Sequence, residues 1–260
     1  MKSSSLAPAT VSEHDGVRYL HLDTPWVQGA MRIARPREIE LEYVRRMMAC
    51  LLLRPSDALG RGHAVQLGLG AAAITRFCHG VLRIRTTAVE LNPTVIDACR
   101  LWFRLPDDSA KLQVLQMDAA DFVADPSRRG SVDMLCVDLY DHEAASPVLD
   151  SAGFYAACHA LLADSGVMAV NLFGCNAGFD TSTERIAKAF GPDRVRRMRA
   201  TKEGNTIVLA LKSDTIADRT VLAARAENIE TRFGLPAGKW LRMLQSLPAS
   251  TTSASDPSAA

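Results

Sequence analysis

The sequence lacks the features that mark membrane, secreted and nucleic-acid-binding proteins. No stretch among its 260 residues approaches the roughly 20 consecutive apolar residues of a membrane-spanning helix. The first residues, MKSSSLAPAT, contain no apolar core of a secretory signal, so we expect a cytoplasmic protein without a membrane contact. A formal net charge of +1 provides no general basic field, and we expect no nucleic-acid partner.

Common metal and catalytic motifs are also missing. The chain has no Gly-x-Ser-x-Gly, no phosphate loop ending in Lys-Ser/Thr and no His-Glu-x-x-His. Its six cysteines lack Cys-x-x-Cys spacing, and most lie in apolar segments typical of reduced core residues. The sequence therefore predicts no metal site.

The pattern that is present alternates short apolar strands with helices between His63 and Phe173. Repeated strand–helix units imply an α/β fold, with a doubly wound, mostly parallel sheet covered by helices on both faces. Two later strands, at 194–200 and 205–213, are expected to form an antiparallel pair that closes one edge of the sheet.

We expect five segments along the chain. Residues 1–12 are small and polar and are predicted to be disordered, as is the low-complexity tail at 249–260. Residues 13–54 show strand alternation in VRYLHLDTPWVQGAMRI, which predicts a small N-terminal β-hairpin domain, and then a linking helix within residues 36–53. Residues 55–212 are expected to form the domain that contains the parallel sheet, and 213–248 a C-terminal helical segment.

Acidic residues stand where the predicted strands end. Glu90 lies 20 residues after Gly70, Asp118 follows the third strand, and Asp138 and Asp141 follow the fourth. In open α/β sheets, ligands bind outside the carboxyl ends of the strands. Carboxylates placed there can hold a ribose, accept from an adenine amine and face a cationic substrate. The pattern predicts an adenosine-containing cofactor and chemistry on positively charged groups.

The order of these segments resembles that of the spermidine synthase family, the polyamine aminopropyltransferases. The matching pieces cover residues 16–212 and comprise LDTPWVQ, EYVRRM, the Gly turn LGLG, VELNPTVIDACR, MDAADF, the D-x-x-D of VDLYD, and SAGFYAACHALLADSGV. The resemblance implies a class I methyltransferase type of Rossmann-like fold, decarboxylated S-adenosylmethionine as co-substrate, a polyamine such as putrescine as acceptor, and a homodimer.

The resemblance also assigns the cofactor-binding residues. Gly68 and Gly70 allow the backbone to approach the cofactor, although a plain strand-to-helix turn explains them as well. Glu90 would accept from the ribose hydroxyls, the alternative being a solvated acid at a strand end. Asp118 and Ala119 would contact adenine, while a helix N-cap at Asp118 is compatible with that role.

The catalytic roles fall on the D-x-x-D pair. Asp138 is expected to act as general base, to bind the substrate amine and to contact the cationic sulfonium cofactor. Asp141 is expected to assist, although both acids could instead cap a loop. Tyr140 could stack on the adenosine or the acceptor, or serve only for packing. Gln28 corresponds to a glutamine that reaches the donor, and an exposed turn residue is its alternative.

The chain departs from the family pattern at Ala71, where an acidic residue usually contacts the aminopropyl arm of the donor. Asp141 is followed by His142 instead of proline, and ATKEGNTIVLAL replaces an aromatic-rich acceptor segment. Two alternatives therefore stay open: a methyltransferase that uses intact S-adenosylmethionine, and a non-catalytic nucleoside-binding homologue.

Overall fold

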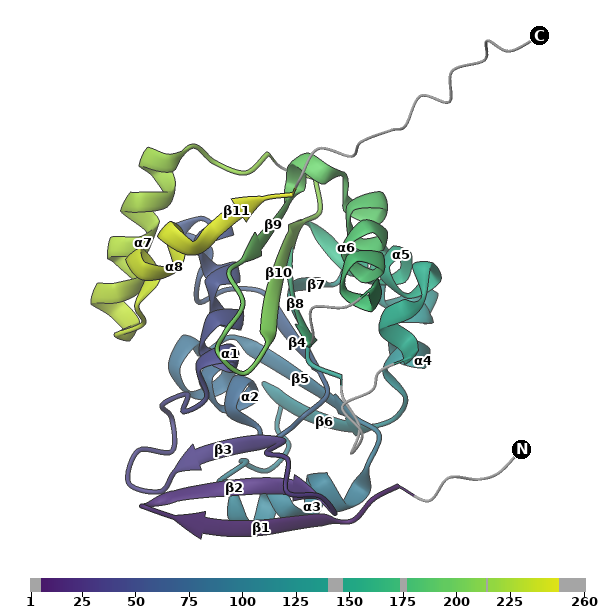
Figure 1. Ribbon diagram of the computed structural model, residues 1–260, viewed down its shortest axis with the longest axis vertical. Helices are drawn as coiled ribbons and strands as arrows, with labels where there is room; N and C mark the ends of the chain where they lie inside the picture. Colours follow the sequence, from purple (N-terminus) through teal and green to yellow (C-terminus); the bar gives the residue numbers. More distant parts are fainter. Residues whose placement is uncertain (1–5, 140–146, 174–176, 214, 248–260) are drawn as a thin grey trace, which may run out of the picture.

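The fold, obtained as a computed structural model, has two sheets that meet at the carboxyl ends of the central strands (Figure 1). The structure describes residues 6–139, 147–173, 177–213 and 215–247. The larger sheet has eight strands in the order β11-β9-β10-β8-β7-β4-β5-β6, and the smaller has the order β1-β2-β3. The mostly parallel Rossmann-like sheet and the small N-terminal β domain are confirmed.

The parallel part of the large sheet consists of β4 (His63–Leu67), β5 (Arg85–Glu90), β6 (Leu112–Gln116), β7 (Val132–Val137) and β8 (Leu162–Phe173). The strands β10 (Asn205–Leu211), β9 (Val195–Met198) and β11 (Leu244–Ser246) extend it in antiparallel fashion beyond β8. The predicted antiparallel pair is therefore present, but β11 and not β9 forms the edge.

The small sheet contains β1 (Ala9–His14), β2 (Val17–Leu22) and β3 (Gly29–Arg32), all antiparallel. Asp15 and Gly16 both have positive φ, 49° and 72°, as a two-residue hairpin turn with the Asp-Gly sequence requires. The prediction that residues 1–12 are disordered is wrong for 9–12, because these residues pair with β2 as part of β1.

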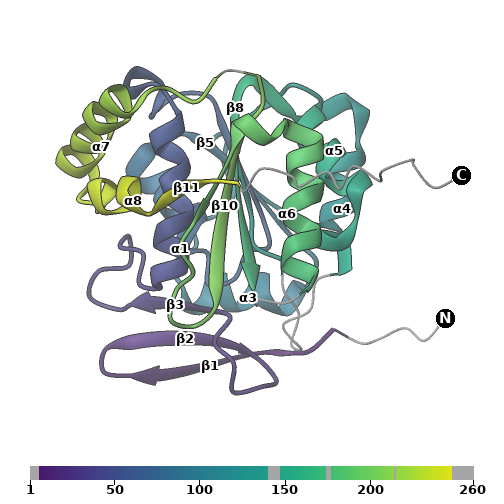
Figure 2. The same cartoon turned by 45° about the horizontal axis from the view of Figure 1, so that its top comes forward.

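Helices cover both faces of the large sheet (Figure 2). One face carries α1 (Glu42–Met47), the 3₁₀ turn 48–53, α2 (Ala73–Phe77), α7 (Arg219–Phe233) and α8 (Ala237–Met243). The other carries α4 (Ala119–Ala124), α5 (Ala152–Leu161) and α6 (Ala177–Phe190), while α3 (Pro93–Trp102) packs with the small sheet. The linking helix begins at Glu42, later than predicted. The other boundaries of the five predicted segments stay a prediction.

Side chains of β7 point alternately into the two hydrophobic cores, one on each face of the large sheet. Met134 and Cys136 belong to the core on the α1 side, whereas Leu135 and Val137 belong to the core on the α5 side. Side chains of a strand alternate between its two faces. The next residue, Asp138, therefore continues the Met134 and Cys136 row and faces α1.

Two further structural observations concern the described ranges. None of the helices there combines the length and apolarity that crossing a membrane demands. No three His, Cys, Asp or Glu side chains in those ranges gather as a metal ion would require.

The small sheet contacts the large one through Gly29. A Cβ atom at Gly29 would lie 2.4 Å from the backbone nitrogen and 2.6 Å from the Cβ of Ala71, in the turn after β4. Real Cβ atoms do not approach so closely, so β3 lies against this turn only because residue 29 has no side chain.

We expect Gly29→Ala to lower the free energy of unfolding by about 1–3 kcal/mol, as overpacking in a buried contact does. Gly153→Ala is the matched control, because its added Cβ meets nothing closer than 3.6 Å. Chemical denaturation of both variants measures the difference. Equal stability of the two variants would show that β3 does not rest on Ala71 in solution.

Candidate active site

The turn after β4 packs against the end of β7 and against the start of β3. Gly68 has φ of +82°, and a Cβ there would lie 2.0 Å from the backbone oxygen of Asp138. Gly70 has φ of +49°, and its added Cβ would lie 3.0 Å from the backbone oxygen of Gln28. The glycines are therefore needed for close packing of the turn against β7 and the small sheet.

Gln66, a buried residue of β4, stabilises this turn through side-chain hydrogen bonds. Its Nε2 donates to the carbonyl oxygens of Gly68 at 2.7 Å and Leu69 at 3.1 Å. Its Oε1 accepts from the backbone nitrogen of Thr75 at 2.9 Å and from the Thr75 hydroxyl at 2.6 Å. One side chain thus connects the strand, the turn and α2.

Glu90 ends β5 beside the same turn. Its Oε2 accepts from the backbone nitrogen of Leu69 and its Oε1 from that of Asn92, both at 2.8 Å. Burial raises the pKa of Glu90, and the backbone hydrogen bonds partly oppose that rise. The carboxylate is held in place, and each oxygen still has a lone pair for a further donor.

Asp118 and Ala119 lie where β6 leads into α4. Asp118 is the N-cap of α4, and its Oδ1 accepts from the backbone nitrogen of Ala120 at 2.7 Å. The capping alternative from the sequence is confirmed, and the adenine contact stays a prediction.

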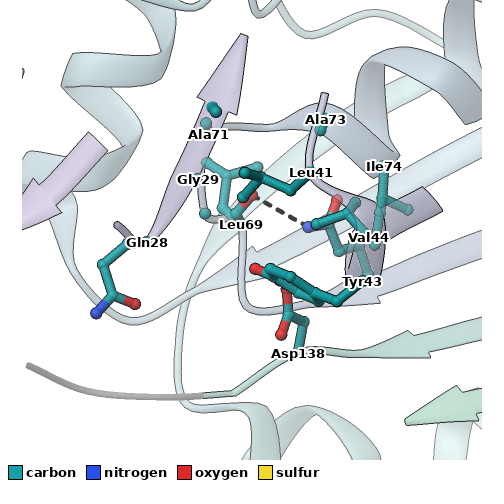
Figure 3. Close-up of a pocket in the computed structure, with 13 residues that line it drawn as sticks. Gln28, Gly29, Leu41, Tyr43, Val44, Leu69, Ala71, Ala73, Ile74 and Asp138 are labelled. Carbon is teal, nitrogen blue, oxygen red and sulfur yellow. Dashed lines mark hydrogen bonds between the residues drawn. The ribbon is translucent and has the colours of Figure 1, made fainter. Parts of the chain in front are cut away.

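Asp138 immediately follows β7 and is partly buried. Its Oδ1 accepts from Nδ2 of Asn171 at 2.9 Å, and its Oδ2 accepts from the Tyr43 hydroxyl at 3.3 Å. Burial raises the pKa of Asp138 to about 6, against the opposing effect of these two hydrogen bonds. Figure 3 shows the Tyr43 and Asp138 side chains next to one another.

A pocket opens in front of this carboxylate (Figure 3). Gln28 lines it together with Asp138, the only charged residue among its described lining residues. Most of the remaining wall is apolar and is made of Leu41, Val44, Leu69, Ala71, Ala73 and Ile74. Of the described lining residues, only this one carboxylate offers a charge to a substrate group that enters here.

The structure thus brings Gln28, Gly70 and Asp138 to one pocket. Gly68 does not line this pocket but packs against the backbone oxygen of Asp138, and Glu90 accepts from the backbone of the same turn. Asp118 and Ala119 stand at the end of β6, two strands from β4. Tyr140 and Asp141 lie outside the described residues, so their roles stay predictions.

Sequence reasoning missed three polar residues that support the site. The helical spacing around Tyr43 indicates only packing, and Gln66 and Asn171 lie in segments that predict apolar strands. Both strand residues carry a usable signal, because a lone amide inside HAVQL or VMAVNLF must find hydrogen-bond partners when the strand is buried.

Known proteins resemble this chain in sequence. No family model matches the chain. The chain is 31% identical over 237 residues to a polyamine aminopropyltransferase of Chromobacterium violaceum, covering 90% of this chain and 88% of the relative. It is 32% identical over 242 residues to one of Neisseria meningitidis serogroup A, covering 92% and 89%.

Solved structures share the fold at lower identity. A probable spermidine synthase from Corynebacterium glutamicum superposes with a TM-score of 0.70 at 17% identity, covering 96% of this chain and 95% of the other. Human methyltransferase-like protein 13, in complex with SAH, superposes with a TM-score of 0.65 at 20% identity, covering 82% and 98%.

The fold is that of the methyltransferase-like α/β class. Within that class the chain belongs to the polyamine aminopropyltransferase family, as the resemblance predicts.

The buried carboxylate predicts a pH-dependent gain of stability in Asp138→Asn. The folded-state pKa of about 6 lies above the unfolded value of 3.8, so ionisation opposes folding increasingly between about pH 4 and pH 6. We expect the variant to gain about 1–3 kcal/mol at pH 8 and almost nothing at pH 4. Denaturation at both pH values measures this. A stability difference between variant and parent that is the same at pH 4 and pH 8 would contradict the raised pKa.

Proposed function

We propose that this protein transfers the aminopropyl group of decarboxylated S-adenosylmethionine to an amine of a small polyamine, with putrescine as the first acceptor to test. Family membership supports the reaction, and the position of Asp138 in the pocket supports the mechanism. A spermidine synthase solved in complex with the transition state analogue AdoDATO has the same fold, with a TM-score of 0.60.

In the proposed step, the nitrogen lone pair of the acceptor attacks the methylene carbon bonded to the sulfonium. The carbon–sulfur bond breaks with its electron pair moving to sulfur, which leaves neutral 5′-methylthioadenosine. The nitrogen gains the aminopropyl group and releases one proton. Asp138 accepts that proton, and its fixed charge favours both cationic reactants.

The carboxylate is suited to this role by its surroundings. A pKa of about 6 leaves Asp138 mostly ionised at neutral pH and makes it a stronger base than an exposed aspartate. The Tyr43 hydroxyl and the Asn171 amide both donate to it, so its two oxygens have fixed directions. General-base catalysis of this kind contributes roughly 10²–10⁴ to a rate.

The remaining predicted residues complete the proposal. Glu90, Gly68 and Gly70 hold the ribose side of the donor, Asp118 and Ala119 the adenine, and Gln28 the sulfonium side. Tyr140 and Asp141 bind the acceptor. By family resemblance we propose a cytoplasmic homodimer.

A second function, methyl transfer from intact S-adenosylmethionine, is favoured by one observation. The pocket wall beside the Gly turn is apolar at Ala71, which is only 3% exposed under Gly29. An aminopropyl ammonium directed at this wall would meet no carboxylate there, whereas a methyltransferase needs no acid at this position of the Gly turn.

We expect thioether release only from the decarboxylated donor when each sulfonium donor is incubated with putrescine. Mass spectrometry distinguishes methylthioadenosine from S-adenosylhomocysteine and identifies the second product. Release of S-adenosylhomocysteine alone would establish methyl transfer instead. Binding of both donors without turnover would establish a non-catalytic protein.

Asp138→Asn should lower transfer by about 10²–10⁴ while methylthioadenosine binding changes little. In the parent, kcat/KM should fall below about pH 6, where Asp138 becomes protonated. Near-normal turnover in Asp138→Asn would remove this residue from the mechanism.

Glu90→Ala should weaken methylthioadenosine binding at least about tenfold, because a carboxylate that accepts from hydroxyls contributes about 1.5–3 kcal/mol. Asp97→Ala is the control, since it removes an exposed carboxylate from the following helix, α3. Calorimetry compares the two variants, with circular dichroism as a check of folding. Equal affinities would exclude Glu90 as a nucleoside ligand.

A further inference from the structure

Three polar side chains form a line across adjacent strands of the large sheet. Asp138 follows β7, Asn171 lies in β8 and Asn205 begins β10. Nδ2 of Asn205 donates to Oδ1 of Asn171 at 3.1 Å, and Nδ2 of Asn171 donates to Oδ1 of Asp138 at 2.9 Å. Asn205 therefore reaches the carboxylate through one intermediate amide.

The alternation of the strands explains why these side chains share a face. Val167 and Ala169 of β8, and Ile207 and Leu209 of β10, belong to the core on the α1 side. Asn171 and Asn205 continue those rows by two residues, as Asp138 continues the row in β7. Both amides are buried, with 2% and 8% exposure, so water is largely removed from them.

Each amide in this line donates to the next residue, from Asn205 to Asn171 and from Asn171 to Asp138. Asn171 presents its NH₂ to the carboxylate, and its carbonyl oxygen then needs a donor on the other side. Asn205 supplies that donor. If Asn205 could not donate, the Asn171 amide could turn by 180° and present its oxygen to Asp138.

The turn between β9 and β10 holds Asn205 in position. The backbone nitrogen of Thr201 donates to the carbonyl of Asn205 at 2.8 Å, and the backbone nitrogen of Asn205 donates to the Thr201 hydroxyl at 3.2 Å. Gly204, with φ of +97°, permits the tight reversal. The line thus ends in a rigid hairpin.

We propose that Asn205 is a positioning residue for Asp138, which by donating to Asn171 keeps the amide NH₂ of Asn171 directed at the carboxylate. Its catalytic meaning rests on the proposed function, because Asp138 matters for catalysis only if it is the base. The orientation itself is a property of the free protein.

The groups that face Asp138 limit what else could control its protonation. From α1 the Tyr43 hydroxyl donates to it, from β8 the Asn171 amide does, and on β7 itself the Cys136 thiol lies on the same face. No Lys or Arg among the described residues forms an ion pair with it. A change in the direction of the Asn171 amide therefore acts on a carboxylate that has one other hydrogen-bond donor, Tyr43, among the described side chains.

Asn205→Asp tests the proposal most directly. The introduced carboxylate accepts instead of donating, so the Asn171 NH₂ turns to it and the Asn171 oxygen faces Asp138. Two oxygens in contact favour the protonated carboxyl, which can donate. We expect the acid limb of kcat/KM, and the pKa of Asp138 followed by ¹³C NMR of aspartate carboxyls, to rise by about one unit or more. Spectra of Asp138→Asn, and of the double variant with Asn205→Asp, assign the signal.

Two further variants separate positioning from folding and from charge. Asn205→Leu removes the donor without adding charge and should give a smaller shift in the same direction. If circular dichroism shows that Asn205→Asp does not fold, Asn205→Leu alone tests whether the donor at position 205 affects Asp138. Lys202→Glu places a larger charge change at an exposed position of the same hairpin and should leave the acid limb in place.

An acid limb and an Asp138 titration that stay unchanged in the folded Asn205 variants, with kcat/KM reduced equally at every pH, would overturn the proposal in favour of a purely structural role. A shifted titration in a protein that transfers no group from either donor would leave the positioning role standing and remove the proposed function.

Discussion

The site depends on a carboxylate placed where water has been largely removed. Asp138 stands at the end of a strand buried on both faces, and desolvation raises its pKa to about 6. An ionised group in such a place is stable only with hydrogen-bond donors, and Tyr43 and Asn171 provide them from a helix and a neighbouring strand. The same burial that opposes ionisation makes the group a stronger base and lowers the stability of the fold at neutral pH.

Close backbone packing brings the other parts of the site to this carboxylate. The turn after β4 approaches both Asp138 and Gln28, and β3 lies on Ala71 because Gly29 has no side chain. Gln66 connects this turn to α2, and Glu90 connects it to β5. The pocket is therefore walled by elements far apart in the sequence, and a shift of any one of them changes its shape.

The described lining of the pocket contains Asp138 as its one charged residue. The sequence resemblance places an acid at the position that Ala71 occupies here. Ala71 is covered by β3, so an added carboxylate would also need the small sheet to move. At residue 71, a change of charge therefore also changes the packing against β3. Which group of the donor lies beside Ala71 is the central question about the activity of this protein.

Local sequence patterns determined much of this protein. Strand–helix alternation and the acids at strand ends predicted the sheet, the small β domain and the edge at which the site lies. These features were predictable because the spacing of apolar residues within a short segment indicates whether it forms a strand or a helix and which face is buried. They did not reveal Tyr43, Asn171 and Asn205 as one group, nor the pairing of residues 9–12, nor β11 at the edge. Those contacts join residues up to 162 positions apart, as between Tyr43 and Asn205 through Asp138 and Asn171. Only the tertiary structure decides them, since a buried amide or hydroxyl takes its partner from whichever strand or helix packs beside it.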